Sequence, residues 1–349
     1  MTIVHETPAR RIIFAAGSAG TLPAELGELG WRRPLVISGR SHAAHAQRLV
    51  ADLGAGDTII GVRVHVPAAI AADARARARE LEADCVVAIG GGSAVGLAKA
   101  VALTEHLPIA AVPTTYAGSE LTTVWGITED GRKTTGRSAA VAPRLVVYDP
   151  ELTYDLPPEI TGPSGMNALA HCVEALWGPH ATPLTEIAAR EGIVLLARGI
   201  PASQQAPSDP EARATALTGA WLAGEAFAAG GGLHHKLCHV IGGMLDLPHA
   251  ELHAILLPHS AAFLLPTAPR AASAIAGALG TDDAAAGLAA LAREVGIPAG
   301  LSALGMTEAD AARVAAAAFP ELPAQPRRPT PVELEDLLLR AVRGTAVGH

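Results

Sequence analysis

From residue 11 to residue 150, short apolar runs alternate with amphipathic segments along the chain. Most of these runs are apolar on both faces, which is typical of parallel strands covered by helices on both sides of a sheet. The order of the elements predicts an α/β domain of Rossmann-like architecture. The expected strands are 11–14, 35–38, 58–64, 85–89, 108–112 and 145–148, and the expected helices are 41–53, 68–83 and 93–103.

The segment 122–135 departs from this alternation. Threonine, valine, tryptophan and isoleucine favour a strand over 122–128, and a second strand-like run covers 132–135. Glu-Asp-Gly at 129–131 separates the two runs. A short Asp-Gly turn between two strand-like runs predicts a β-hairpin.

Beyond residue 157 the apolar positions recur at helical spacing, and almost no strand pattern remains. We therefore expect two domains, an α/β dinucleotide-binding domain over 1–157 and an all-helical catalytic domain over 158–349. Proline-rich segments at 201–210 and 320–331 are expected to be connecting loops. The expected helices are 163–177, 183–199, 210–229, 232–243, 250–264, 268–278, 283–294, 307–317 and 331–343.

Charge and composition then exclude several classes of partner. The 349 residues carry a formal net charge of −8 and no basic run, so we expect no nucleic-acid partner. No apolar stretch reaches the ~18 residues that span a bilayer, and the N-terminus lacks a signal pattern. The three cysteines lie far apart without a CxxC pair, as in proteins of a reducing compartment. We expect a cytoplasmic protein with no membrane partner.

A glycine turn and a hydroxyl-rich loop each follow a predicted strand. Three glycines and Ser93 open a helix after the strand 85–89, where the backbone can approach a pyrophosphate and the helix start can bind its charge. The spacing differs from GxGxxG. The loop at 113–120 follows the next strand, and ligands of open α/β sheets bind at such carboxyl ends. The candidates for cofactor binding are Gly91, Gly92, Ser93, Thr114, Thr115, Gly118 and Ser119.

Ser38, Gly39 and Arg40 close the strand 35–38 and are further candidates for binding the cofactor. NAD-selective enzymes commonly place a carboxylate near this point, where it binds the 2′-hydroxyl of the ribose. Gly39 and Arg40 carry no negative charge that would repel a 2′-phosphate. We therefore expect the protein to use both NADH and NADPH.

Histidines are concentrated between residues 231 and 253, which hold five of the 14 in the chain. Several of them are four residues apart and so share one face of a helix. Asn167 and His171 form another such pair upstream. Two helices can thus direct these side chains into one pocket. The candidate catalytic residues are Asn167, His171, His235, His239, His249 and His253.

Further residues are candidates for binding the carboxylates of a substrate. Lys236 follows a glycine-rich bend, and Arg137 lies on the expected hairpin together with Arg132 and Lys133. The hairpin cations are equally expected as a solvated edge that discourages strand pairing. The substrate-binding candidates are Lys236, His234, Tyr116 and Arg137.

Together these motifs resemble the iron-containing alcohol dehydrogenase family, and within it the maleylacetate reductases. The resemblance extends over residues 10–343, and its most specific stretches are YAGSE at 116–120, GRKTTGR at 131–137 and LHHKLCH at 233–239. It implies a Rossmann-like domain followed by a helical domain, as in dehydroquinate synthase, and a homodimer. It also implies NADH- or NADPH-dependent reduction of the conjugated C=C bond of maleylacetate, a small dicarboxylate of aromatic degradation, to 3-oxoadipate.

The resemblance also indicates which residues would bind a metal ion. The family holds its metal with one aspartate and three histidines, and the matching positions here are Asn167, His171, His235 and His249, while His239 matches an additional active-site histidine. An amide in place of the carboxylate forgoes about 10 kcal/mol of attraction to a dication ~3 Å away at an effective dielectric of ~20, before desolvation. We expect function without a metal. If one binds, its ligands would be His171, His235 and His249.

A conjugated enone offers a chemical reason why a metal is dispensable. Hydride adds at the distal alkene carbon, and hydrogen-bond donors can stabilise the resulting enolate, whereas an isolated carbonyl needs stronger polarisation. His171, His235 and His249 would then surround the enolate and the carboxylates. His239 or His253 would deliver a proton to the carbon beside the ketone.

Three other functions are compatible with the same sequence. The first is an iron- or zinc-dependent alcohol or aldehyde reductase of the same fold, which chelation would inactivate. The second is a dehydroquinate-synthase-like lyase, which needs zinc and uses NAD only transiently, so that net NADH consumption would exclude it. The third is a non-catalytic nucleotide-binding protein, which would form no product.

Overall fold

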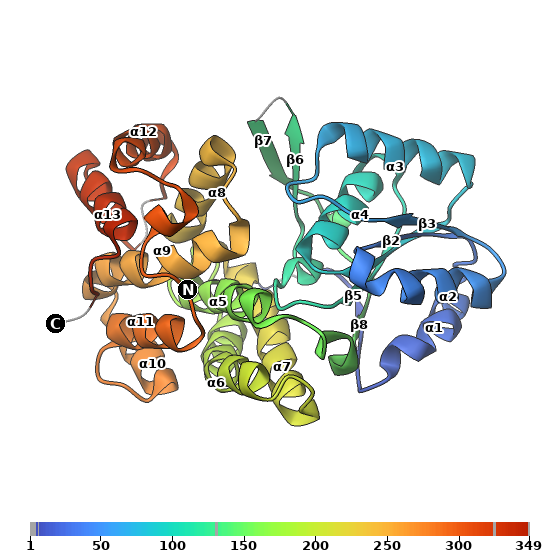
Figure 1. Ribbon diagram of the computed structural model, residues 1–349, viewed down its shortest axis with the longest axis horizontal. Coiled ribbons are helices and arrows are strands. Elements are labelled where there is room, and N and C mark those ends of the chain that lie inside the picture. Colours follow the sequence, from blue (N-terminus) through green and yellow to red (C-terminus); the bar gives the residue numbers. More distant parts are fainter. Residues whose placement is uncertain (1–4, 6, 130–131, 324–325, 348–349) are drawn as a thin grey trace. The chain divides into compact units, whose positions relative to one another are not determined.

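The computed structural model describes residues 5, 7–129, 132–323 and 326–347, apart from the side chains of Arg132 and Lys133. Its contacts divide the chain into two compact units, Glu6–Leu156 and Pro157–His349, and His5 joins the second. The first unit is a parallel α/β domain and the second is helical, which confirms the predicted fold class (Figure 1). Within the described part of the chain, no helix is both long and apolar enough to cross a bilayer.

The first unit contains a parallel sheet of six strands in the order β1-β8-β5-β4-β2-β3, together with the antiparallel hairpin β6-β7. The strand order reverses next to β2, because β3 lies on one side of it and β4 on the other. Its elements are β1 Arg11–Phe14, α1 Leu22–Glu28, β2 Pro34–Ser38, α2 Ala43–Leu53, β3 Asp57–Ile60, α3 Ala68–Glu80, β4 Cys85–Gly90, α4 Gly92–Glu105, β5 Ile109–Pro113, β6 Val124–Glu129, β7 Arg132–Arg137 and β8 Leu145–Tyr148.

Helices cover both faces of this sheet, which is why its central strands are apolar throughout (Figure 1). On β4, Val86 and Ala88 pack with α3 and α4, whereas Val87 and Ile89 pack with α1 and α2 on the opposite face. Alternate residues of a strand point to opposite faces, so a strand covered on both sides needs apolar residues at every position.

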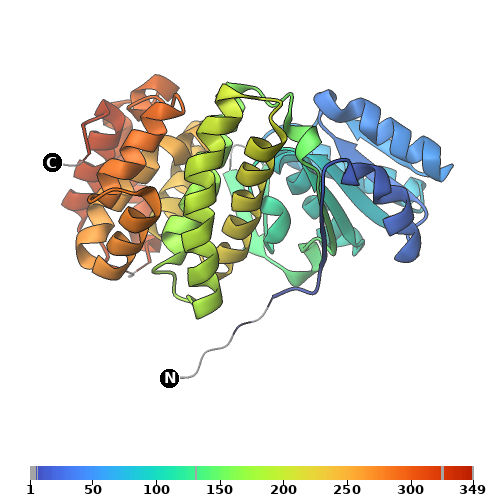
Figure 2. The same cartoon turned by 90° about the horizontal axis from the view of Figure 1, so that it is seen from below.

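The second unit is built from α5 and the helices that follow it. The long helices α6 and α7 run side by side (Figure 2), and a Cβ atom added at Gly199 of α6 would lie 2.5 Å from the backbone nitrogen of Ala216 on α7. The helices are α5 Pro158–Ala175, α6 Pro183–Gln205, α7 Pro210–Ala226, α8 Leu233–Leu245, α9 His249–Leu264, α10 Pro269–Leu279, α11 Ala284–Glu294, α12 Glu308–Ala318 and α13 Pro331–Arg343.

Several expected boundaries are wrong. The strand expected over 58–64 ends at Ile60, because Gly61 adopts a φ of +88° and the chain leaves the sheet there. The helix α1 was not expected from the sequence. The turn of the expected hairpin includes residues 130 and 131, which lie outside the described residues.

The loop expected over 201–210 is also wrong in its first half, because α6 continues through Pro201 to Gln205. Pro201 is buried, and Gln204 Nε2 donates to the carbonyl oxygens of Pro158 at 2.9 Å and Val295 at 3.2 Å. Tertiary contacts therefore extend the helix beyond a residue that usually ends one. The helix expected from residue 163 likewise begins earlier, at Pro158, because proline is well suited to a first helical position.

Candidate active site

The predicted cofactor residues lie at the carboxyl ends of β2, β4 and β5, three neighbouring strands. Gly90 has a φ of +152°, and its carbonyl oxygen accepts the N–H of Thr114 at 3.2 Å. A Cβ atom added at Gly91 would lie 2.8 Å from Cγ2 of Thr115, so this glycine lets the loop after β5 close onto the turn. The edge where strand order reverses is where open α/β sheets bind nucleotides.

The remaining candidates of this unit differ in accessibility. The Ser38 hydroxyl is buried and donates to the Gly39 carbonyl at 3.0 Å, whereas Arg40 is exposed. Tyr116 is fully buried, and Arg137 is exposed at the end of β7. Gly118 has a φ of +72°, which lets the loop turn before Ser119. A ligand could therefore reach Arg40 and Arg137 directly, but not the Tyr116 side chain.

Lys99, to which the sequence alone assigned no role, has a buried side chain in this unit. Its ammonium group is fully buried and lies 2.7 to 2.9 Å from the Ser119, Thr122 and Val124 carbonyl oxygens and the Thr122 hydroxyl. Burial lowers the pKa of Lys99 to about 7. Lys99 therefore ties α4, which starts at the glycine turn, to the segment that follows the hydroxyl-rich loop.

The second unit brings the predicted histidines together from α5, α8 and α9. The ring centroids of His171 and His235 are 5.0 Å apart, those of His235 and His253 are 4.8 Å apart, and those of His253 and His249 are 4.4 Å apart. His239 completes the cluster at 6.0 Å from His249. The cluster predicted from the i,i+4 spacing is therefore one continuous set of rings.

Glu174 is at the base of this cluster, and its role was not predicted. It is fully buried on α5, and its carboxylate accepts the backbone N–H groups of Gly232 at 2.9 Å, His234 at 2.9 Å and His235 at 3.2 Å. The same carboxylate is also hydrogen-bonded to Nδ1 of the His235 ring. Glu174 thus caps the start of α8 and fixes the orientation of His235, so that Nε2 faces away from the carboxylate.

These contacts predict a loss of stability in the Glu174→Gln variant. Burial alone would raise the pKa of Glu174, but His235 and the Gly232 N–H outweigh it and lower the pKa to about 2. Because this lies below the ordinary value of 4.5, the carboxylate stabilises the fold above pH 4.5 and this contribution is lost as pH falls towards 2. The difference corresponds to about 3 kcal/mol.

We expect urea denaturation at neutral pH to show the Glu174→Gln variant less stable by about this amount, ~3 kcal/mol. The stability difference between wild type and variant should shrink as pH falls from 4.5 to 2. Glu191→Gln, at an exposed glutamate of α6, is the control and should leave stability within ~0.5 kcal/mol. A Glu174→Gln protein as stable as wild type would contradict the capping role.

His234 and His253 are joined in a chain of hydrogen bonds that ends in α9. Nδ1 of His253 lies 2.9 Å from Nε2 of His234, and Nδ1 of His234 lies 3.0 Å from Oγ of Ser260. The Ser260 hydroxyl donates to the Leu257 carbonyl oxygen at 3.0 Å. Both ring nitrogens of His234 are thus used inside the protein, which does not favour the direct substrate contact predicted for it.

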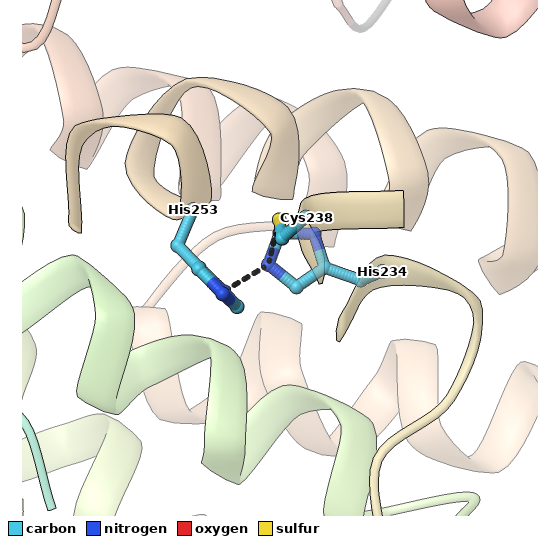
Figure 3. Close-up of side chains that lie close together, drawn as sticks. All are labelled: His234, Cys238 and His253. Carbon is cyan, nitrogen blue, oxygen red and sulfur yellow. Dashed lines mark hydrogen bonds between the residues drawn. The ribbon is translucent and has the colours of Figure 1, made fainter. Parts of the chain in front are cut away.

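One further cluster could in principle hold a metal: His234, Cys238 and His253 (Figure 3). Among the described residues, it is the one group of three histidine, cysteine or acidic side chains whose donor atoms all lie within 4.8 Å of one another. Ligand nitrogens around tetrahedral zinc are about 3.3 Å apart. The 2.9 Å between the two rings is instead a hydrogen-bond distance. We therefore interpret this cluster as a pair of hydrogen-bonded histidines, with Cys238 Sγ 3.8 Å from Nε2 of His234 as a further, weaker hydrogen-bond partner.

Three buried nitrogens of the cluster have no hydrogen-bond partner within the described protein: Nδ1 of His171, Nε2 of His235 and Nε2 of His253. Buried polar atoms are nearly always paired, so unpaired ones at adjacent rings indicate the position of a ligand. Burial and the neighbouring rings hold the pKa of His171 and His253 well below the ordinary value. An anionic ligand would offset that effect by favouring the charged rings.

Lys236 was predicted to bind a substrate carboxylate, but in the structure it is paired with a carboxylate of the protein. Its ammonium group is paired with the carboxylate of Glu321, and the side chain is 29% exposed. A substrate carboxylate would have to compete with Glu321 for this lysine. His239 and His249, by contrast, are half-buried at the margin of the cluster.

Comparison with known proteins shows the family to which the chain belongs. A family model described as iron-containing alcohol dehydrogenase matches residues 9–150, and one described as the C-terminal part of the Fe-containing alcohol dehydrogenase family matches residues 161–342. The chain belongs to this family. Within it, the chain is 46% identical to a maleylacetate reductase of Sphingobium indicum over 99% of this chain and 98% of the relative. A maleylacetate reductase of Pseudomonas knackmussii is 47% identical, over 100% and 99%.

Solved structures of the family have the same fold. The crystal structure of maleylacetate reductase from a Rhizobium species superposes with a TM-score of 0.93 at 40% identity, covering 98% of this chain and 99% of that one. A sulfoacetaldehyde reductase from Bifidobacterium kashiwanohense, solved in complex with NAD⁺, is 25% identical with a TM-score of 0.88, over 98% and 99%.

The residues at the family's metal positions in this chain do not fit a metal. The amide of Asn167 supplies no charge. In the described structure, the donor atoms of His171, His235 and His249 do not all lie within 4.8 Å of one another. A closed tetrahedral site needs donors closer together than this and usually an anionic ligand. We therefore derive no step of the chemistry from a bound cation.

Proposed function

We propose that this protein is a maleylacetate reductase that transfers hydride from NADH or NADPH to the conjugated C=C bond of a small dicarboxylate and needs no metal. The relatives named above support the substrate. The observation that carries the proposal is the group of three adjacent buried imidazoles, His171, His235 and His253, each with a ring nitrogen left without a protein partner. Such nitrogens suit a substrate with two carboxylates and a ketone.

The reaction divides between the cofactor and the histidines. Hydride adds to the alkene carbon distal to the ketone, the C=C electrons move to the ketone oxygen, and an enolate forms. Glu174 accepts the proton on Nδ1 of His235, which leaves Nε2 of that ring facing the substrate, and an Nε2–H there can donate to the enolate oxygen or to a carboxylate. His171 lies beside His235 and His249 lies beside His253, so both rings border the same anionic charge.

We assign the proton donor to His253 rather than His239. Nδ1 of His253 is held by His234, while Nε2 has no protein partner and is directed away from that contact. A proton on Nε2 passes to the carbon beside the ketone as the enolate collapses, which gives the saturated ketone and NAD(P)⁺. Such a transfer contributes about 10²- to 10⁴-fold to a rate.

Product analysis tests the reaction. NADH deuterated at the transferred position should place deuterium on the alkene carbon distal to the ketone. Reaction in D₂O should place deuterium on the carbon beside the ketone. Formation of a hydroxy acid with the C=C bond intact would contradict the proposal and identify a carbonyl reductase. No net NADH oxidation would favour a lyase or a non-catalytic nucleotide-binding protein.

Cofactor choice is assigned to the residues that end β2. Arg40 is exposed there next to Gly39, and no carboxylate occupies either position. We expect Arg40→Ala to raise KM for NADPH by about 10-fold, the effect of losing one charge-assisted contact, and to change KM for NADH by less than ~3-fold. Initial rates at saturating substrate with each cofactor measure this. Equal effects on both cofactors would contradict a role in 2′-phosphate binding.

The remaining expectations concern cellular context. Cys85, Cys172 and Cys238 are all unpaired and buried, which supports the proposed cytoplasmic location. A homodimer is likewise proposed from the family resemblance, and sedimentation equilibrium would measure it.

A further inference from the structure

The hydrogen bonds behind His253 have a direction, which follows from the donors and acceptors available. The Ser260 hydroxyl has one proton, and it donates this proton to the Leu257 carbonyl oxygen at 3.0 Å. Its oxygen must therefore accept the proton on Nδ1 of His234, 3.0 Å away. With Nδ1 protonated, neutral His234 offers a lone pair at Nε2.

The same reasoning gives the tautomer of the neighbouring ring, His253. Nε2 of His234 has a lone pair, so Nδ1 of His253, 2.9 Å away, must carry the proton of that hydrogen bond. Neutral His253 is then an Nδ1–H tautomer with its lone pair on Nε2, the atom without a protein partner. Both tautomers are thus determined by a carbonyl group on α9.

We infer that Ser260 and His234 are positioning residues that fix the tautomer of His253. This inference depends on the proposed role of His253 as the proton donor. After His253 gives up the proton on Nε2, the ring is left as the Nδ1–H tautomer, which is the one that His234 and Ser260 stabilise. The ring therefore needs no rearrangement between protonation states. Ser260 and His234 are buried and need not touch the substrate.

Removing the Ser260 hydroxyl should reverse this chain. In Ser260→Ala the proton on Nδ1 of His234 has no acceptor, which is costly in a buried site, so His234 is expected to shift to its Nε2–H tautomer. Nε2–H of His234 would then donate to Nδ1 of His253 and force neutral His253 to carry its proton on Nε2. If doubly protonated His253 then gave up its Nε2 proton, its Nδ1–H would face the Nε2–H of His234, and neither group could accept a hydrogen bond from the other.

Nitrogen-15 NMR of histidine-labelled, full-length protein tests this without reference to activity. In wild type, we expect neutral His234 and His253 both to show the Nδ1–H tautomer, with His234→Gln and His253→Gln variants used to assign their signals. Ser260→Ala should convert both rings to Nε2–H. The matched control is Ser164→Ala, because Ser164 is another buried serine whose hydroxyl donates to a carbonyl three residues earlier, at 3.3 Å from Thr161.

Kinetics provide the second measurement. Ser260→Ala should lower kcat by about 10-fold or more while KM changes by less than ~3-fold, and Ser260→Thr, which restores the hydroxyl, should recover most of the rate. Nε2–H tautomers in the wild type, or unchanged tautomers in Ser260→Ala, would overturn the inference. Absence of any maleylacetate turnover in wild type with the expected tautomers would instead contradict the proposed function. If Ser260→Ala does not fold, the wild-type spectrum and Ser260→Thr decide the inference.

Discussion

His253→Asn should lower kcat for maleylacetate by about 10²- to 10⁴-fold, because it removes the group proposed to protonate the enolate. Asparagine keeps a polar side chain in a fully buried position next to His234, so the change in polarity is smaller than on substitution by an apolar residue. The affinity for NADH should not change, because the predicted cofactor residues belong to the first unit. Steady-state kinetics and NADH fluorescence titration measure the two effects separately.

His239→Asn is the comparison that decides between the two histidines. His239 is half-buried, and its ring is 6.4 Å from His235 and 6.0 Å from His249. We expect its substitution to raise KM more than it lowers kcat, since it lies at the margin of the cluster. Full kcat in His253→Asn together with a large loss in His239→Asn would assign the proton donor to His239.

Asn167→Asp should raise the affinity of the histidine cluster for a divalent metal. The new carboxylate adds one unit of negative charge on α5, on the same face as His171. The attraction of that charge to a dication ~3 Å away is about 10 kcal/mol at an effective dielectric of ~20 before desolvation. Allowing for desolvation, we expect an affinity gain for Zn²⁺ of at least ~10³-fold, or about 4 kcal/mol.

Isothermal titration of chelator-treated protein measures that affinity. Asn167→Ala is the control, because it removes the amide without adding a charge and should bind Zn²⁺ no better than wild type. Zinc bound by Asn167→Asp should also slow reduction of maleylacetate, since it would occupy imidazole nitrogens that we assign to the substrate. Equal affinity in wild type and Asn167→Asp would show that the amide is not what weakens metal binding.

Part of the histidine cluster could be predicted from local information, whereas the contact between His171 on α5 and His235 on α8 depends on tertiary packing. Residues four apart on one helix must share a face, so the spacing of His235 and His239 alone places them together. The glycine turn is similarly local, since a buried strand, three glycines and a helix follow each other directly. Both features depend on neighbours in the sequence, and both lie where expected.

Glu174 and Lys99 could not be assigned in the same way, because their partners are distant in the sequence. Glu174 acts on backbone N–H groups at 232–235, and Lys99 on carbonyl oxygens at 119–124. A signal was nevertheless present: each is a lone charged residue within a long apolar helical stretch. A charge at such a position is rarely buried without partners, so it indicates a tertiary contact even where the partner is unknown.

The direct test of metal-independent enone reduction is NADH consumption with maleylacetate by protein dialysed against a chelator, with its iron and zinc content measured in the same sample. We predict sustained turnover to 3-oxoadipate by metal-free protein, at a rate that added Fe²⁺ or Zn²⁺ does not raise. Turnover that appears only after Fe²⁺ or Zn²⁺ is restored would contradict it and would mean that the histidines hold a catalytic cation despite Asn167.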